Sequence, residues 1–341
     1  MPGTYLNYPF DEEIFINAWA EEPDPIKNAM IQSGAMVNDS LIASRIAEGS
    51  NVYTIPFYNT IGGTPVNLDG ATNITSTETT GGFQSGIVYG RAIGWTARDF
   101  VGTLSGNDPM GHITASVAKF WQKQNQATLI GILGAIFGID DDDEWSKHSV
   151  ELLSETADAS LITATTLNDV MTAALGDNKS AFSMAIMHSA VAKTLEDLQV
   201  LEYWKYTDAN GIQRPTNIAS VNGLTVIVDD GVPNEKVGGA GANKDLIKYT
   251  TYLLGAGCIR FAPARLTFPA AEVHRDPAKN GGQETLYTRI RQTIHPNGFS
   301  FTAPASGFTE SPTDAQLFAA DNWSIKFNAK AIPIARVITN G

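Results

Sequence analysis

The sequence predicts a single α+β unit with two lobes and two projections, an N-terminal arm and a long β ribbon. Residues 52–97 are rich in Thr, Gly and β-branched residues, which is typical of a two-stranded ribbon. Residues 108–137 carry apolar side chains at helical spacing. Shorter strand-like and helix-like segments follow, and no internal repeat or Pro/Ser-rich linker divides the chain.

The composition is that of a folded chain. Of its 341 residues, 43% are hydrophobic and 17% are charged, which is enough for a core and too few charges for disorder. The net charge of -13 disfavours a groove that binds nucleic acid by its phosphates. A negative charge suits the wall of a container for nucleic acid. It is equally well explained if the charge only keeps the chain soluble.

Cysteine content and hydropathy bear on the compartment. Cys258 is the only cysteine, so no intrachain disulfide forms, and its apolar neighbours predict a buried thiol. No run of apolar residues reaches the length of a membrane span, and the N-terminus lacks the pattern of a signal peptide. We therefore expect a protein of the cytosol that does not enter a membrane.

Residues 1–36 form an irregular arm, and residues 37–51 contain a short helix. The apolar side chains of the arm follow neither a helical nor a strand period. A free arm would expose these large groups to water at a cost, so we expect a neighbouring subunit to hold it. The candidate contacts are Tyr5, Tyr8, Phe10, Phe15 and Trp19.

Residues 52–97 form the predicted ribbon. Its tip, roughly 60–82, is polar and has almost no core-forming residues. An isolated hairpin is marginally stable in water, so the ribbon needs a partner surface. The candidate contacts in the tip are Ile61, Leu68 and Ile74.

The long helix follows. Asp108 can cap it and Pro109 fits its first turn. Unbroken, it would be roughly 45 Å long, which suits a structural spine. The acidic segment 138–145 after it invites a calcium interpretation, but its contiguous acids lack the alternation of an EF-hand loop. We favour a solvated turn.

The remaining chain alternates between short elements. Gly223 and Gly231 bound one strand, and Gly176 ends one helix. We expect helices at 160–176, 190–199 and 314–320, strands at 182–187, 224–228 and 331–338, a β pair or a strand and turn at 247–263, a glycine-rich loop at 234–245, and two short strands within 272–301.

His188 and Ser189 stand where a strand feeds a helix, the position at which some hydrolases keep a nucleophile. The G-x-S-x-G elbow is absent, because Met187 and Val191 occupy the positions of its glycines. The structural alternative makes Ser189 the N-cap of the following helix. We favour the architectural interpretation, although a triad built from remote residues remains an alternative.

Other candidate sites are weak. The loop 238–244 fails the Walker A pattern, because Lys244 is followed by Asp rather than by Ser or Thr. The five histidines have no metal-ligand spacing, and the single cysteine has no second one near it. We therefore expect no cofactor and no metal.

Taken in order, these segments resemble the major capsid proteins of tailed bacteriophages with the HK97-type shell fold. Three stretches carry the resemblance most clearly: "SMAIMHSAVAKTLEDLQVLEYW" (183–204), with its His-Ser junction, "GLTVIVDDGVP" (223–233), and "EVHRDPAKNGGQETLYTRIRQTIHPNGFSF" (272–301). The resemblance implies an arm at 1–36, a short helix at 37–51, an extended ribbon at 52–97, a peripheral lobe at 98–144, an axial lobe at 145–265, and a return to the peripheral lobe at 266–341.

The resemblance also implies a function. Many copies would assemble as hexamers and pentamers into an icosahedral shell around double-stranded DNA, without catalysis and without sequence-specific DNA binding. The axial loop, with Gly238, Gly239, Gly241 and Asn243, would lie near the symmetry axis. The protein would belong to the virion and would assemble in the cytoplasm of the bacterial host.

The resemblance further implies partner proteins, and two alternative functions remain. A portal protein and a separate scaffolding protein are expected, and a decoration protein is an open option. Many relatives carry an N-terminal scaffolding extension, and the short arm before the first helix here implies a separate scaffolding protein or none. The rivals are an encapsulin-like compartment, which shares the fold, and a serine hydrolase that uses His188 and Ser189.

Overall fold

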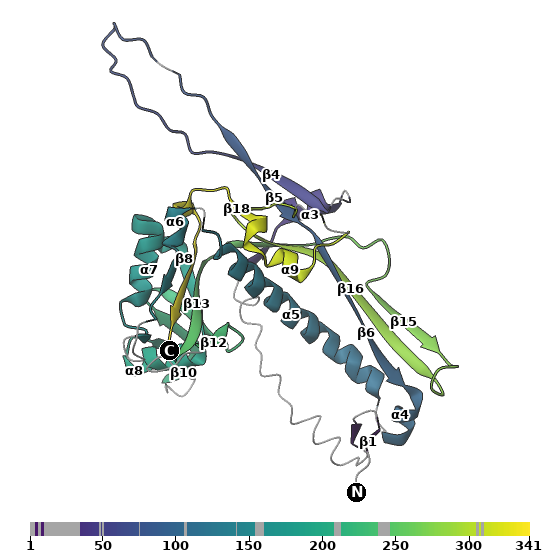
Figure 1. The fold of residues 1–341 in the computed structure, drawn as a ribbon. Helices are drawn as coiled ribbons and strands as arrows, with labels where there is room; N and C mark the ends of the chain where they lie inside the picture. The colour runs from purple at the N-terminus through teal and green to yellow at the C-terminus, as the bar shows by residue number, and fades with distance from the viewer. Residues whose placement is uncertain are drawn as a thin grey trace.

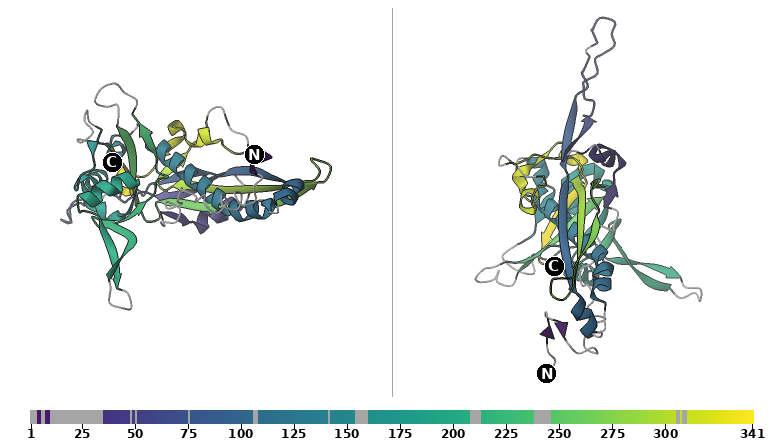
Figure 2. Two further views of the ribbon diagram at one scale, coloured as in Figure 1. Left: turned by 90° about the horizontal axis from the view of Figure 1, so that it is seen from below. Right: turned by 90° about the vertical axis from the view of Figure 1, so that its right-hand side faces the viewer.

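The computed structural model describes residues 4–5, 8–9, 35–47, 49, 51–74, 76–105, 108–140, 142–153, 160–207, 213–237, 246–304, 307 and 310–341. Figure 1 shows two lobes, built on two different sheets, with a long helix that runs from one to the other. A narrow ribbon projects from the region where the lobes meet, as the views in Figure 2 confirm.

The first lobe is built on an eight-stranded mixed sheet. Its strands run in the order β7 (Ser149–Glu151), β19 (Ile334–Thr339), β13 (Ile247–Gly255), β8 (Phe182–Met187), β11 (Leu224–Val228), β10 (Gln213–Val221) and β9 (Glu202–Thr207), and β12 (Asn234–Lys236) pairs with β13. Strand β8 is parallel to β11 and antiparallel to β13. The hairpin of β9 and β10 extends away from this lobe (Figure 2).

Both faces of this sheet are buried. Successive residues of β8 alternate between two cores, with Ala185 and Met187 in one and Met184 and Ile186 in the other. The first core also contains the buried faces of α7 (Thr166–Leu175) and α8 (Ser189–Asp197). The second contains the C-terminal half of the long helix, so the sheet lies between two helical layers.

The second lobe is an elongated five-stranded sheet. Its strands are β15 (Ala271–Asp276), β16 (Gln283–Pro296), β14 (Ile259–Pro263), β3 (Met36–Asn38) and β6 (Tyr89–Arg98). Strand β6 pairs antiparallel with β16 along its whole length. The short helix α4 (Asp99–Ser105) follows β6 and precedes the long helix.

The long helix predicted at 108–137 is confirmed as α5 (Pro109–Ile136), and it joins the two lobes. Asp108 caps it by accepting a hydrogen bond from Gly111 N–H at 3.0 Å, and Pro109 is its first residue. Its N-terminal half lies on β6 and β16, where Trp121 Nε1–H donates to Thr288 Oγ1. Its C-terminal half is apolar and buried against the eight-stranded sheet.

The acidic segment after α5 begins a helix instead of forming only a turn. Asp142 caps α6 (Asp143–Ser146), and within it Trp145 is fully buried. The indole of Trp145 donates to the Ile136 carbonyl at 2.8 Å and stacks on Phe137. The tryptophan therefore anchors a segment in which Asp140 and Asp143 are exposed. The described residues contain no group of three metal-ligating side chains.

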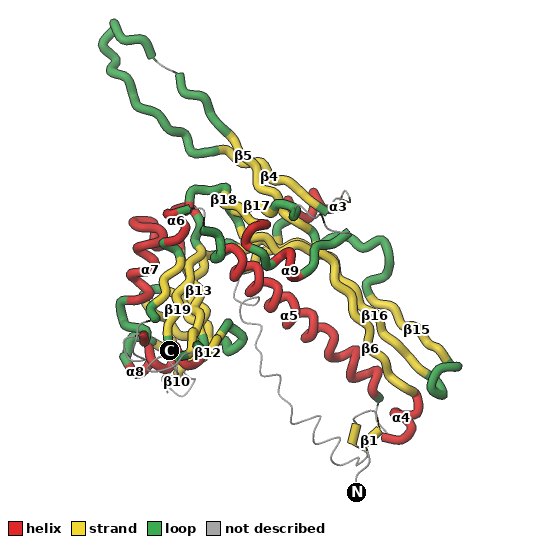
Figure 3. The backbone as a smooth tube through the Cα atoms, viewed as in Figure 1, coloured by secondary structure: helices red, strands yellow, loops and turns green. Residues whose placement is uncertain are grey.

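Smaller elements complete the molecule (Figure 3). They are β1 (Thr4–Tyr5), β2 (Tyr8–Pro9), α3 (Ser40–Ala47), β17 (Phe299–Phe301), α9 (Asp314–Leu317), β18 (Trp323–Ile325) and three 3-10 turns at Gly176–Ala181, Ala320–Asn322 and Ala329–Ala331. None of the helices in the described part of the chain is long and apolar enough to cross a membrane.

The ribbon is shorter than predicted. Only β4 (Val52–Tyr58) and β5 (Gly81–Ile87) pair with each other, and the segment 89–97 belongs to the five-stranded sheet as β6. The alternation of Tyr89, Ile93 and Trp95 explains the difference, because these side chains give β6 an apolar face. Trp95 meets Phe120 of α5 edge to face.

Sheet membership also departs from the predicted lobe bounds. The chain changes sheets at 256–258, between β13 and β14, so residues 259–263 belong to the five-stranded sheet. The last strand, β19, lies inside the eight-stranded sheet and not with the other C-terminal elements. Ile334 faces one core while Ala335 and Val337 face the other, as an interior strand requires.

The helix predicted at 160–176 begins six residues later, at Thr166. Thr163 N–H donates to Thr166 Oγ1, and the two threonine hydroxyls are 2.8 Å apart. Such side-chain bonds compete with helical hydrogen bonding, which explains the late start. The strands predicted at 182–187 and 224–228 are confirmed, as is the burial of Cys258.

Candidate assembly surfaces

The base of the ribbon is fixed to the five-stranded sheet. Tyr53 is buried, and its hydroxyl lies 3.0 Å from Thr293 Oγ1. The ring fits because its cross-strand partner is Gly86, where a Cβ atom would stand 2.2 Å from the ring. On the next strand residue, Ser85 N–H donates to Ser300 Oγ at 2.9 Å. Burial raises the pKa of Tyr53, so the hydroxyl stays protonated.

The tip of the ribbon has no core of its own. Ile61, Leu68 and Ile74, the predicted contacts, are 80%, 86% and 79% exposed. Its order is local: Asn59 N–H donates to the Thr80 carbonyl, and Asp69 accepts from the N–H groups of Ala71 and Thr72. These hydrogen bonds lower the pKa of Asp69 to about 2. Figure 1 shows the tip extending far from both lobes.

Two further aromatic side chains extend this apolar surface. Tyr58 at the end of β4 and Phe83 in β5 are both largely exposed. The sequence analysis did not select them, although the two-residue period of β4, with Tyr53 and Ile55 inward, places Tyr58 outward. We call the five side chains together the ribbon surface: Tyr58, Ile61, Leu68, Ile74 and Phe83. An exposed apolar set of this kind is typical of an interaction surface.

The other predicted contacts are only partly covered by the structure. In the arm, Tyr5 and Tyr8 are opposite each other in the β1–β2 pair. The remaining three, Phe10, Phe15 and Trp19, lie outside the described residues. The axial-loop residues Gly238, Gly239, Gly241 and Asn243 also lie outside them.

The His188–Ser189 pair is architectural, but the predicted cap was wrong. The N-cap of α8 is His188, whose Nδ1 accepts a hydrogen bond from Ala190 N–H at 3.1 Å. Ser189 is the first helical residue, and its N–H donates to Asp230 Oδ1 at 3.0 Å. Both side chains can accept the hydrogen bond of an N-cap. His188 is the N-cap because its backbone is extended, as the residue before a helix requires.

This geometry does not suit a nucleophile. Ser189 Oγ lies 3.5 Å from His188 Nδ1, the nitrogen whose lone pair already accepts the capping hydrogen bond. A general base needs that lone pair for the serine proton. The pair therefore orients α8 at the end of β8, and the described residues around it offer no activated hydroxyl.

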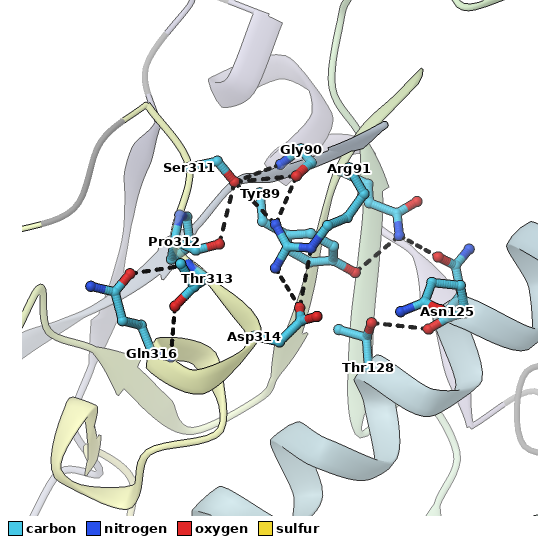
Figure 4. A network of polar contacts seen from close by, with 12 residues as sticks. Tyr89, Gly90, Arg91, Asn125, Thr128, Ser311, Pro312, Thr313, Asp314 and Gln316 are labelled. Carbon is cyan, nitrogen blue, oxygen red and sulfur yellow. Dashed lines mark hydrogen bonds and ion pairs between the residues drawn. The ribbon is translucent and has the colours of Figure 1, made fainter. Parts of the chain in front are cut away.

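A polar network fixes the C-terminal segment to the body (Figure 4). Arg91 of β6 donates to Asp314, and Ser311 Oγ accepts from Gly90 N–H at 2.9 Å. From the neighbouring strand β16, Gln292 Nε2–H donates to Tyr89 Oη and to Asn125 Oδ1. Because each bond joins elements distant in sequence, the network makes β6, β16, α5 and α9 one rigid platform at the base of the ribbon.

Comparison with known proteins decides the family. The major capsid protein of Bacillus phage SPP1 is 31% identical over 314 residues, which is 91% of this chain and 90% of that protein. The chain belongs to the phage major capsid proteins. No model of a protein family matches it.

Solved structures confirm the fold. The capsid of Ralstonia phage GP4 aligns with a TM-score of 0.58 at 10% identity, over 90% of this chain and 86% of that chain. The capsid asymmetric unit of cyanophage Pam1 gives 0.57 at 10% identity, over 94% and 93%. The HK97-type α+β fold predicted from the sequence is therefore confirmed.

Membership in this family settles the broad function. Major capsid proteins form the shell of a virion, and the family is structural rather than enzymatic. The capsid protein described here is therefore a virion component that acts as many copies of itself. The hydrolase alternative is not favoured, in agreement with the occupied lone pair of His188.

Proposed function

We propose that this capsid protein assembles as hexamers and pentamers into an icosahedral shell that encloses double-stranded DNA. The similarity to the SPP1 major capsid protein over 91% of the chain carries the proposal. The ribbon surface supports it, because its five large apolar side chains are exposed in the single subunit. Burial of such side chains between subunits is a favourable contribution that the isolated chain does not have.

In this proposal the ribbon of each subunit lies on a neighbour, and a neighbour holds the arm. The hydrogen bonds of Tyr53 and Ser85 support the first part, because they fix the base of the ribbon to the body and so hold the exposed tip away from it. Each subunit would thus give its apolar tip to one neighbour and receive that of another. Contacts of this type close a shell by repetition.

The lobe with the eight-stranded sheet would face the symmetry axis, and the five-stranded sheet with α5 would form the periphery. The predicted bounds 145–265 and 266–341 are then adjusted so that β14 counts as peripheral and β19 as axial. The glycine-rich loop at 238–244 would lie near the axis, where five or six copies meet.

The proposed partners are a portal protein and a separate scaffolding protein, with a decoration protein as an optional addition. Assembly would take place in the cytoplasm of the bacterial host. The net charge of -13 is consistent with enclosure of DNA without tight binding, because an acidic chain does not attract phosphates.

Nuclease protection tests the content of the shell. Particles are purified from infected or induced bacterial cells, treated with nuclease, and then opened. Double-stranded DNA recovered only after opening is the expected result. Particles that hold a folded enzyme and no DNA would support the encapsulin-like alternative and contradict the proposal.

A further inference from the structure

One polar contact lies at the point where α5 passes from one lobe to the other. Gln126 of α5 donates its Nε2–H to Asp229 Oδ2 at 2.8 Å. Asp229 directly follows β11 of the eight-stranded sheet. The contact therefore joins the helix of the peripheral lobe to the sheet of the axial lobe.

Both partners are removed from water. Gln126 is 2% exposed and Asp229 is fully buried. The second carboxylate oxygen, Asp229 Oδ1, accepts from Gly231 N–H at 2.9 Å, and the Asp229 N–H donates to the Met187 carbonyl. Loss of the Gln126 bond would leave one buried carboxylate oxygen without its donor, which is unfavourable.

Gln126 lies at the point along α5 where the helix becomes buried. All buried residues of α5 lie from Gln126 to the C-terminus, and the half before Gln126 is partly or fully exposed. Gln126 is thus the first buried residue where the helix meets the axial sheet. The views in Figures 1 and 2 show α5 continuing from this region along the second lobe.

Apolar contacts surround the hydrogen bond. Leu129 and Leu133 of α5 share one core with Met184 and Leu254 of the axial sheet. These close-packed contacts hold the helix against the sheet, and the hydrogen bond adds a contact whose strength falls steeply when its angle changes. A rotation of one lobe against the other would break this bond.

We propose that the Gln126–Asp229 hydrogen bond is a latch that fixes the angle between α5 and the axial sheet, and that it thereby helps to set the curvature of the shell. The second clause rests on the proposed function. Subunits with one fixed interlobe angle assemble with uniform curvature, and subunits with a variable angle assemble into particles of variable size.

The latch is tested first in the unassembled subunit. Spin labels are placed at Lys119→Cys on α5 and Lys193→Cys on α8, both of which are exposed. Native Cys258 does not compete, because burial raises its thiol pKa to about 12. The distance distribution between the labels then reports the interlobe angle by pulsed electron paramagnetic resonance.

Three variants and a control make the measurement specific. Gln126→Leu and Asp229→Ala remove the latch and should broaden the distance distribution. Asp229→Asn should keep the narrow distribution, because the Gln126 amide can turn and offer its oxygen to the new donor. Gln84→Leu removes another buried glutamine, whose hydrogen bonds go to Asn297 and Gly298 at the base of the ribbon and not to α5, and it should leave the distribution narrow.

The outcomes are distinct. Narrow distributions in both Gln126→Leu and Asp229→Ala would overturn the latch, and so would equal broadening in Gln84→Leu. If Asp229→Ala fails to fold, the distance distribution of Gln126→Leu alone decides whether the latch exists. Particle diameters by electron microscopy then test the consequence: wild-type shells should be uniform and Gln126→Leu particles should vary in size. Uniform variant shells would overturn the role in curvature. If the wild type forms no shell, the proposed function fails, while the distance measurement still decides the latch.

Discussion

The fit of Tyr53 against Gly86 makes the base of the ribbon sensitive to one methyl group. In Gly86→Ala the new Cβ would stand 2.2 Å from the Tyr53 ring, so the ring must move. Overpacking of a core costs about 1–3 kcal/mol, and the lost hydrogen bond to Thr293 costs about 1 kcal/mol more. The lower backbone entropy of unfolded Ala offsets about 0.5–1 kcal/mol. We expect a net loss of about 2–3 kcal/mol in the free energy of unfolding.

Chemical denaturation of the unassembled subunit measures this loss. Gly134→Ala is the matched control, because Gly134 lies in α5 with open space where its Cβ would be. Alanine is the better helix former by about 1 kcal/mol, so the control should gain stability. A Gly86→Ala subunit as stable as the wild type would refute the packing argument, provided that the control behaves as expected.

Three further predictions concern other parts of the molecule. His188→Ala should lower the free energy of unfolding by about 1 kcal/mol through loss of the cap, while Ser189→Ala should change it by less than about 0.5 kcal/mol; the reverse order in a denaturant titration would restore Ser189 as the cap. Burial lowers the pKa of His295 to about 3, below its unfolded value of about 6.5, so the unfolded chain binds more protons between these values. Stability should therefore fall by up to about 2 kcal/mol from pH 6.5 to pH 5, and His295→Phe should remove that part of the slope; equal slopes would contradict the assignment. Replacing residues 60–79 by an Asn-Gly turn should leave a soluble, folded subunit that no longer forms shells, and normal shells from this variant would rule out the role of the ribbon.

The sequence predicted the elements whose signals are local. Asp108 and Pro109 mark the start of α5, and its apolar period continues to Ile136. The apolar run before His188 predicted β8 with its bounds. The exposed tip of the ribbon followed from its lack of core-forming residues. These features depend on neighbours within a few positions, which the sequence displays directly.

Features that depend on distant partners could not be predicted. The assignment of β6 to the body depends on β16, whose paired residues lie nearly two hundred positions away. The role of Asp229 was hidden, because the segment before Gly231 served only to mark the end of a strand, and the partner Gln126 lies about a hundred residues away. The choice of His188 over Ser189 as the N-cap depends on the backbone torsions at His188. The sequence does not reveal these torsions, because either side chain can accept the capping hydrogen bond.

Electron microscopy of the purified protein tests the central claim most directly, that this chain is a shell subunit. The protein is imaged across a range of salt and protein concentrations, beside the variant with the shortened ribbon. We predict closed shells from the wild-type chain and none from the variant. Wild-type protein that remains a discrete, monodisperse monomer under every assembly condition would contradict the claim.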